Sequence, residues 1–164
     1  MHLLNQRDHR AMPWKNGGGV TFEVAVGPIG AGIDAFDWRI SMARVETPGP
    51  FSAFPGCDRI LTVLSGGPMT LAVGDAPVRQ LDETSAPFAF AADVPSAAET
   101  VDTPLLDLNV MVRRGRATAT VSRHRRVNLR VSPRNATTLV LARGGSAAVS
   151  SLHKLMADGD VLVL

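Results

Sequence analysis

Hydrophobic and polar residues alternate in many short segments of this chain, which is the pattern of half-buried β-strands. Residues 20–26 alternate in this way up to a Gly-Pro pair, and residues 36–42 alternate again. Further strands are expected at residues 59–64, 69–73, 88–90, 106–112, 118–121, 127–131, 137–142, 147–149 and 161–164. No window has the period of a long helix, so the pattern predicts an all-β sandwich or barrel.

Two of these strands carry one polar face each. Arg39 and Ser41 share a face of one strand, and Asp107, Asn109 and Met111 share a face of a later one. If these faces point into a barrel they line a ligand pocket, where Arg39 can hold a carboxylate through two parallel hydrogen bonds. If they point outward they are ordinary solvated faces. The pattern alone leaves both orientations open.

The composition indicates a packed globular protein. Of its 164 residues 45% are hydrophobic, yet no run of about 18 apolar residues could cross a membrane. The polar start does not fit a secretory signal. The single cysteine, Cys57, cannot form an internal disulfide and fits a reducing compartment. We therefore expect a cytoplasmic protein with no membrane partner.

Charge is distributed unevenly along the chain. Residues 1–107 carry 7 basic and 13 acidic residues, and residues 108–164 carry 10 and 2, which gives the net charge of +2. Such an arginine-rich segment attracts nucleic acid, but no recognition motif accompanies it. Packing of an acidic half against a basic half, within one chain or in a homodimer, explains the same distribution. The arginines in question stand at positions 113, 114, 116, 123, 125, 126, 130 and 134.

A weak internal repeat suggests two halves. Residues 61–67 and residues 139–145 each join an apolar strand to a Gly-Gly turn. Two barrel-like halves, residues 1–116 and the smaller residues 117–164, are therefore expected to pack into one compact unit.

Several ordered motifs point to a known family. Residues 12–19 read Met-Pro-Trp-Lys-Asn-Gly-Gly-Gly, and residues 49–56 read Gly-Pro-Phe-Ser-Ala-Phe-Pro-Gly. Residues 36–43 contain Phe-Asp-Trp-Arg-Ile-Ser-Met-Ala, and residues 107–115 read Asp-Leu-Asn-Val-Met-Val-Arg-Arg-Gly. As a set, and with the apolar ending of the chain, these motifs resemble the HutD/Ves family.

The resemblance implies a fold and a role. It implies the RmlC-like cupin fold, a jelly-roll β-barrel, with two cupin-like halves. It also implies a link to histidine utilisation, where such proteins bind an intermediate such as formylglutamate, with no established catalysis. The chain departs from the family at Phe90-Ala91-Ala92-Asp93, where a glycine usually precedes the aspartate. The mouth of the pocket is expected to differ there.

The residues do not support a metal centre. Cupin metal sites use closely spaced His-x-His with a carboxylate and a further histidine. His2, His9, His124 and His153 lack that spacing, so we expect no metal and no cofactor. Cys57 has no histidine near it in sequence and fits a small buried filler better than a nucleophile.

The glycine-rich segment after Trp14 has two structural interpretations. Successive backbone N–H groups of Lys15-Asn16-Gly17-Gly18-Gly19 could hold an anion, with Lys15 adding a positive charge. The same residues could form an Asn-Gly turn followed by a bulge. Arg59 likewise fits a ligand contact or a local ion pair with Asp58.

Three hypotheses follow for function. The first is a binding protein for a small acidic metabolite. The second is a metal-independent isomerase or hydrolase that uses a buried acid, Asp107 or Asp58. The third is a nucleic-acid binder, which we do not favour. The candidate ligand-binding residues are Lys15, Asn16, Trp38, Arg39, Ser41, Arg59, Asp107, Asn109 and Met111.

Overall fold

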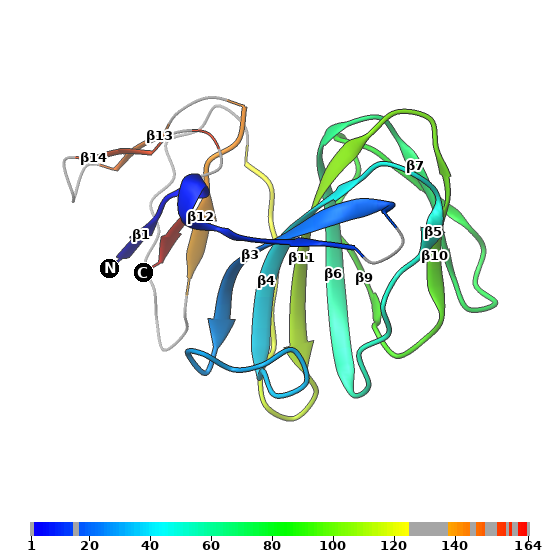
Figure 1. The fold of residues 1–164 in the computed structure, drawn as a ribbon, viewed down its shortest axis with the longest axis horizontal. Helices are drawn as coiled ribbons and strands as arrows, with labels where there is room; N and C mark the ends of the chain where they lie inside the picture. Colours follow the sequence, from blue (N-terminus) through cyan, green and yellow to red (C-terminus); the bar gives the residue numbers. More distant parts are fainter. Residues whose placement is uncertain are drawn as a thin grey trace. The chain divides into compact units, whose positions relative to one another are not determined.

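The computed structural model describes residues 2–14, 17–124, 138–144, 147–149, 154–156, 158 and 161–163 (Figure 1). These residues form two compact units. One unit is Arg10–Arg123, and the other combines Met1–His9 with His124–Leu164.

A six-stranded antiparallel sheet forms one wall of the unit Arg10–Arg123. Its strand order is β2-β3-β4-β11-β6-β9. The strands are β2 (Arg10–Pro13), β3 (Gly19–Gly27), β4 (Trp38–Val45), β11 (Leu105–Arg113), β6 (Cys57–Gly66) and β9 (Phe88–Ala91).

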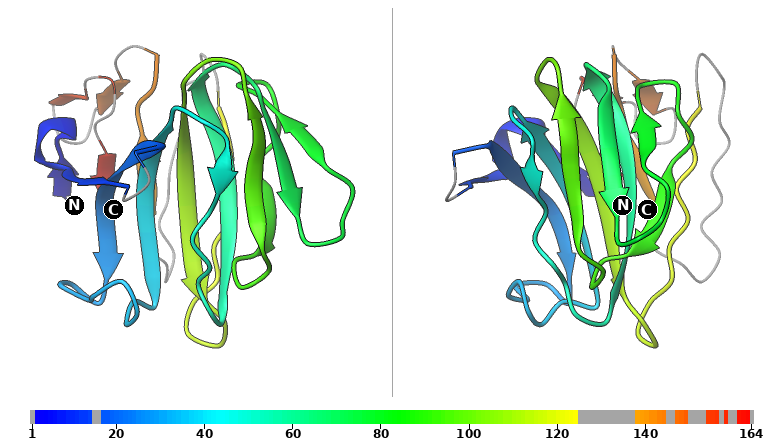
Figure 2. Two further views of the ribbon diagram at one scale, coloured as in Figure 1. Left: turned by 45° about the vertical axis from the view of Figure 1, so that its right-hand side comes forward. Right: turned by 90° about the vertical axis from the view of Figure 1, so that its right-hand side faces the viewer.

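A four-stranded sheet forms the opposite wall. Its order is β5-β10-β7-β8, and its strands are β5 (Gly49–Pro50), β10 (Ser96–Val101), β7 (Met69–Val73) and β8 (Arg79–Leu81). Figure 2 shows the long strands of the six-stranded sheet side by side, with the four-stranded sheet facing them. The two sheets together enclose the core of a barrel.

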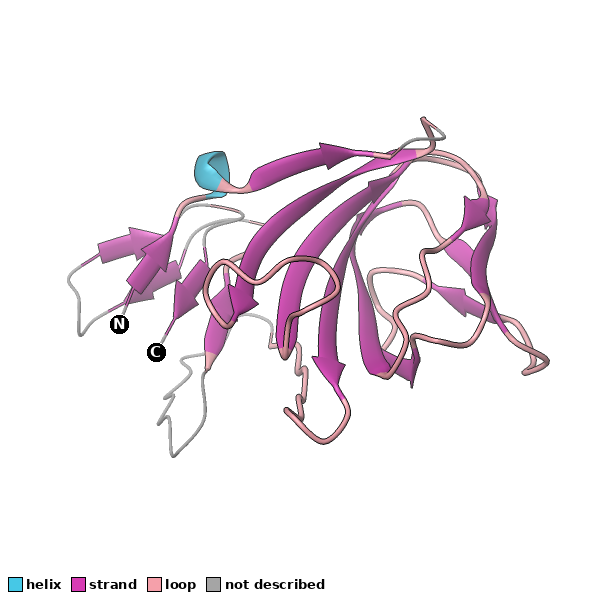
Figure 3. Cartoon of the chain, turned by 60° about the horizontal axis from the view of Figure 1, so that its bottom comes forward, coloured by secondary structure: helices cyan, strands magenta, loops and turns pink. Residues whose placement is uncertain are grey.

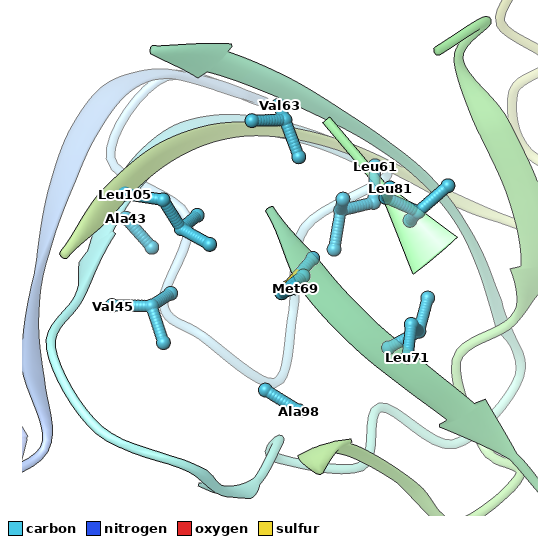
Figure 4. Close-up of a cluster of buried hydrophobic side chains, with 9 residues drawn as sticks. All are labelled: Ala43, Val45, Leu61, Val63, Met69, Leu71, Leu81, Ala98 and Leu105. Carbon is cyan, nitrogen blue, oxygen red and sulfur yellow. The ribbon is translucent and has the colours of Figure 1, made fainter. Parts of the chain in front are cut away.

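The apolar core of this unit lies between the two sheets (Figure 4). The residues in it from the six-stranded sheet occupy alternate positions on their strands, as side chains on one face must. That face is therefore the inner face. The core consists of Ala43, Val45, Leu61, Val63 and Leu105 from one sheet and Met69, Leu71, Leu81 and Ala98 from the other.

The register of β3 shifts once against β4. Glu23 pairs with Ser41, whereas Ala25 pairs with Ile40, so one extra residue stands between them in β3. A β-bulge of this kind changes which side chains of a strand face inward. Glu23 lies before the bulge and pairs with Ser41, so it shares the inner face of β4.

The unit that combines Met1–His9 with His124–Leu164 contains short strands. β15 (Val161–Val163) pairs with both β1 (His2–Leu4) and β12 (Leu139–Leu141), and β13 (Ala147–Val149) pairs with β14 (Lys154–Met156). In the described part of the chain the helix content is a 3₁₀ turn at Gln6–Asp8 (Figure 3). No helix there is long and apolar enough to span a membrane.

The all-β prediction is confirmed, and most predicted strands exist within a few residues of their expected bounds. The strand predicted at residues 118–121 is wrong. Its side chains alternate between exposed and half-buried as in a strand, but the segment pairs with no strand that the structure describes. Residues 127–131 lie outside the described residues.

Candidate functional site

Five polar side chains lie buried on the inner face of the six-stranded sheet, and we call them the inner polar cluster. Each is at most 7% exposed, and the cluster consists of Arg39, Ser41, Arg59, Asp107 and Asn109. They share the face of the apolar core because they occupy the same alternate positions. Across the sheet, Met111 pairs with both Arg39 and Arg59, and Asn109 pairs with Ser41. The polar faces that the sequence left unoriented therefore point inward.

Arg39 is fixed by an ion pair and a hydrogen bond. Its Nε donates to Oε2 of Glu23 at 2.8 Å, and its Nη1 donates to the Ser41 hydroxyl at 3.3 Å. The Arg39 side chain is 4% exposed and that of Glu23 is 22% exposed. A guanidinium this deeply buried needs a partner carboxylate, and Glu23 of β3 supplies one.

Asp107 is a buried carboxyl with one partner side chain. The Asn109 side-chain amide donates to Asp107 Oδ1 at 2.6 Å. Burial raises the pKa of Asp107 to about 7, although the charge of Arg59 and the hydrogen bonds from Asn109 and the Ala43 backbone oppose that rise. Among the described residues, Asp107 Oδ2 and Asn109 Oδ1 have no hydrogen-bond partner. Two buried acceptors are therefore left for a donor from outside this cluster.

Arg59 is surrounded by aromatic rings. Its guanidinium carbon lies 5.5 Å from the ring centroids of Phe51 and Phe54 and 5.7 Å from that of Phe90. Such stacking stabilises a buried cation without an ion pair. Its Nη2 donates to the Ser52 carbonyl at 3.3 Å, while its Nε has no hydrogen-bond partner in the described part of the chain.

The environment of Arg59 changes its acidity. Burial lowers the pKa of Arg59 to about 10, with the nearby Arg39 charge acting in the same direction and Asp107 opposing it. The group is still protonated at neutral pH. Two cationic side chains therefore stand within one buried cluster, balanced by Glu23 and by an aspartate that titrates near neutrality.

The inner polar cluster interrupts an otherwise apolar interior. On β11, Leu105 belongs to the core described above, Asp107 and Asn109 follow it on the same face, and Met111 belongs to a second apolar cluster. That second cluster also contains Phe36, Cys57 and Ala92, with Phe54 packed against it. Buried polar groups in such surroundings indicate a functional site, since packing alone would favour apolar residues.

Other predicted site residues lie elsewhere. Trp38 stands on the opposite face of β4, where its indole covers Gly27 so closely that a Cβ on that glycine would lie 2.2 Å from Nε1. Lys15 and Asn16 lie outside the described residues. Beside them, Trp14 N donates to the Gly19 carbonyl at 2.9 Å, which is a tight connection between β2 and β3.

Asp58, the second candidate acid, pairs with Arg114 at the surface. Arg114 Nη1 donates to Asp58 Oδ1 at 2.8 Å, and Nη2 donates to Asp93 Oδ2. Asp93 also accepts from the Gly56 backbone, and these bonds lower the pKa of Asp93. Asp93, which lies in the segment that departs from the family pattern, therefore links that segment to the segments that contain Gly56 and Arg114.

Arginines of the arginine-rich segment donate hydrogen bonds to the backbone of the unit Arg10–Arg123. Arg113 donates to the carbonyls of Phe36 and Asp34, and Arg123 donates to the carbonyls of Val63 and Glu83. The arginines at positions 125, 126, 130 and 134 lie outside the described residues.

The donor set does not suit a metal ion. Within the described ranges no group of three or more His, Cys, Asp or Glu side chains could hold a metal ion. The inner polar cluster holds two guanidinium groups and one carboxyl, whereas cupin-type metal centres need imidazoles and carboxylates.

Sequence reasoning missed two kinds of residue. Glu23 lies beside Arg39 because β3 pairs with β4 in the register that sets Glu23 opposite Ser41, and the alternating pattern of residues 20–26 does not reveal that register. Phe51, Phe54 and Phe90 lie in three separate segments, and no spacing rule joins them. The Phe-x-x-Phe within residues 49–56 was the available signal, since paired aromatics in a loop are common at binding sites.

These features define an all-β, cupin-like protein with a buried, cation-bearing polar cluster. The sequence model of HutD matches residues 6–164, and the chain belongs to the HutD family. It is 40% identical over 111 residues to an uncharacterised 21.2 kDa protein in the hutC 3' region of Pseudomonas putida, covering 68% of this chain. The chain spans 57% of the length of that relative. It is also 38% identical over 148 residues to protein Ves of Cronobacter sakazakii, covering 88% of this chain and 75% of Ves.

Solved structures show the same relationship. HutD from Pseudomonas fluorescens SBW25 matches with a TM-score of 0.71 and 26% identity, over 99% of this chain and 86% of that one. A conserved protein of unknown function from Pseudomonas aeruginosa PAO1 matches with a TM-score of 0.64 and 39% identity, over 69% and 57%. KdgF from Halomonas shares the fold alone, at 14% identity and a TM-score of 0.52, over 70% of this chain and 94% of KdgF.

Proposed function

We propose that this protein binds a small acidic metabolite at the inner polar cluster and acts in a regulatory or accessory role in histidine utilisation. The observation that carries the proposal is that three buried atoms of this cluster have no hydrogen-bond partner among the described residues: Arg59 Nε, Asp107 Oδ2 and Asn109 Oδ1. Native proteins rarely leave such groups unpaired, because each costs about 1–3 kcal/mol. A bound molecule would remove that cost.

The unsatisfied atoms specify complementary chemistry. Arg59 Nε is a donor and suits an anionic oxygen, preferably a carboxylate. Asp107 Oδ2 and Asn109 Oδ1 are acceptors and suit an N–H or O–H group. A formylglutamate-like molecule carries carboxylates and an amide N–H, so it meets both requirements. The hutC-region relative and the HutD structure support a place in histidine utilisation.

Thermal melting against histidine-pathway intermediates tests the proposal, with N-formyl-L-glutamate as the first probe and L-glutamate as its comparison. A ligand at 100 times its dissociation constant stabilises by about 2.7 kcal/mol. That corresponds to a rise in melting temperature of roughly 5–11 °C for a chain of this size. No rise with any compound of the panel would count against binding.

Variants locate the effect. Arg59→Gln should abolish the ligand-induced rise in melting temperature. Arg44→Gln removes a charge from an exposed pair with Glu46 and should keep that rise. Asn109→Ser serves as the second site variant if Arg59→Gln does not fold. If a folded site variant shows the same ligand-induced rise in melting temperature as the wild type, the ligand binds outside the inner polar cluster.

A second function is favoured by Asp107 itself. A buried carboxyl with a pKa of about 7 and one unpaired oxygen fits a general acid or base. Turnover of a small polar substrate, with a bell-shaped pH dependence that Asp107→Asn removes, would establish a metal-independent cupin enzyme. Saturable binding without turnover would favour the first function.

The division into two cupin-like halves, residues 1–116 and 117–164, is likewise proposed on the Gly-Gly repeat. The cytoplasm is the compartment proposed for the protein, and a second copy of the chain is a proposed partner. Nucleic acid is not proposed.

A further inference from the structure

Within the described residues, β8 and β9 are edge strands of the two sheets of the unit Arg10–Arg123, and the Arg79 side chain of β8 lies against β9. In β8, Leu81 pairs with Met69 and Arg79 pairs with Leu71. Because Leu81, Met69 and Leu71 are core residues, Arg79 lies on the inner face as well. Its guanidinium carbon lies 4.8 Å from the ring centroid of Phe88, in β9 of the opposite sheet.

Aromatic rings continue from this contact toward the inner polar cluster. Phe88 and Phe90 stack with their centroids 5.7 Å apart and their planes 25° apart. The Phe90 centroid in turn lies 5.7 Å from the guanidinium carbon of Arg59. Both phenylalanines are half-buried, Arg79 is exposed and Arg59 is 6% exposed. The two stacked rings therefore extend from the exposed Arg79 to the buried Arg59, and a guanidinium group lies at each end of them.

Arg79 differs in its pairing from Arg44 and Arg114, two other exposed arginines of this unit. Arg44 is paired with Glu46, and Arg114 with Asp58 and Asp93. Arg79 forms no ion pair with any residue that the structure describes. Stacking on Phe88 leaves the N–H edges of a guanidinium available to an anion.

We propose that Arg79 is an outer recruiting residue that draws a carboxylate-bearing small molecule into the barrel between β8 and β9, toward Arg59. The inference rests on the proposed function, since it assumes that the ligand binds at the inner polar cluster. An exposed cation at the entrance raises the local concentration of anions and speeds association. The rings of Phe88 and Phe90 form no hydrogen bonds that would hold the anion between the two arginines. The anion therefore leaves Arg79 and binds Arg59.

Stopped-flow measurement of N-formyl-L-glutamate binding tests the inference. Tryptophan fluorescence is the signal, because Trp14 lies 6.5 Å from Phe51, which stacks on Arg59. In Arg79→Gln the association rate constant should fall about three- to tenfold in low salt, as one charge contributes only part of the roughly 10- to 1000-fold effect of a whole charged cleft. The loss should disappear at about 0.5 M salt, where the screening length is only a few ångströms. The dissociation rate constant should change less than twofold.

Two further variants separate charge from other effects. Arg79→Lys keeps the charge and should retain most of the association rate. Arg116→Gln removes an exposed arginine from the turn after β11 and should leave the rate unchanged.

The outcomes distinguish this inference from the proposed function. Wild-type binding with an unchanged association rate in Arg79→Gln overturns the recruiting role and leaves the proposed function intact. A change confined to dissociation, or an equal loss in Arg79→Lys, overturns it too. Absence of wild-type binding in calorimetry overturns both. If Arg79→Gln does not fold, a wild-type association rate that is independent of salt overturns the inference.

Discussion

Asn109 donates a 2.6 Å hydrogen bond to Oδ1 of Asp107, two residues away on the same face of β11, while Oδ2 of Asp107 has no partner among the described residues. Successive inner positions of one strand thus form a small polar pair inside the barrel. The amide holds the carboxyl in one orientation, and the second oxygen is presented to whatever enters.

The pH dependence of stability should report this carboxyl. The folded protein keeps Asp107 protonated up to about pH 7, and the unfolded chain only to about 3.8. Because the folded state binds the extra proton between these values, the free energy of unfolding should fall by up to about 4 kcal/mol as pH rises from about 4 to 7. Above pH 7 this contribution levels off.

Asp107→Asn isolates that contribution, because an amide of the same shape does not titrate. Denaturant unfolding at pH 5 and pH 8 should show a smaller drop in stability for the variant than for the wild type. An identical drop in both proteins would mean that Asp107 is ionised throughout this range.

The ion pair between Arg39 and Glu23 should matter more than a surface pair. Glu23→Gln leaves the Arg39 charge buried, and we expect a loss of roughly 2–4 kcal/mol in unfolding free energy. Glu46→Gln breaks the exposed pair with Arg44 and should cost at most about 1 kcal/mol. Equal losses in the two variants, measured by denaturant unfolding, would contradict a structural role for the buried pair of Arg39 and Glu23.

Gly19 should not tolerate a side chain. A Cβ there would lie 2.2 Å from the backbone carbonyl oxygen of Arg44, which cannot move without disturbing β4. Gly19→Ala should cost about 1–3 kcal/mol or more through this overlap. Gly32→Ala meets no atom within 4 Å and should be neutral or slightly stabilising. Melting temperatures of the two variants check the contrast, and a stable Gly19→Ala protein would show that the connection after β2 is looser.

Cys57 should react slowly while the protein is folded. The thiol is 1% exposed, and burial raises its pKa, which lowers the fraction of reactive thiolate. Labelling with a chromogenic disulfide at pH 8 should be slow in buffer and fast in guanidinium chloride. Rapid labelling of the native protein would indicate that the apolar cluster around Phe36 and Met111 opens readily.

The sequence predicted much of the architecture. Strand alternation located β3 and β4, because a half-buried strand imposes period two on its residues. β6 was predicted as a run that is apolar on both faces and ends at a Gly-Gly-Pro turn, and β7, β9 and β11 as the short strands that follow it. Short strands such as β5 and β8 were missed, since two or three residues carry no period. The segment 118–121 shows the opposite error: alternation is necessary for a strand but does not supply a pairing partner.

For the candidate site, the sequence determined which residues are polar and which of them share a strand face. Because residues two positions apart on a strand share a face, the sequence alone groups Arg39 with Ser41 and Asp107 with Asn109. It could not determine which face is inner, because Ile40, Met42 and Val110 on the other face are buried too. Hydrophobicity therefore does not distinguish the two faces of this sheet.

Only the tertiary structure decided the orientation and the partners. The four-stranded sheet covers the face that carries the inner polar cluster, and the pairing register of β3 with β4 brings Glu23 to Arg39. Phe51, Phe54 and Phe90 meet at Arg59 from segments far apart in the chain. Pairing register and sheet packing depend on contacts between distant residues, and no local pattern records them.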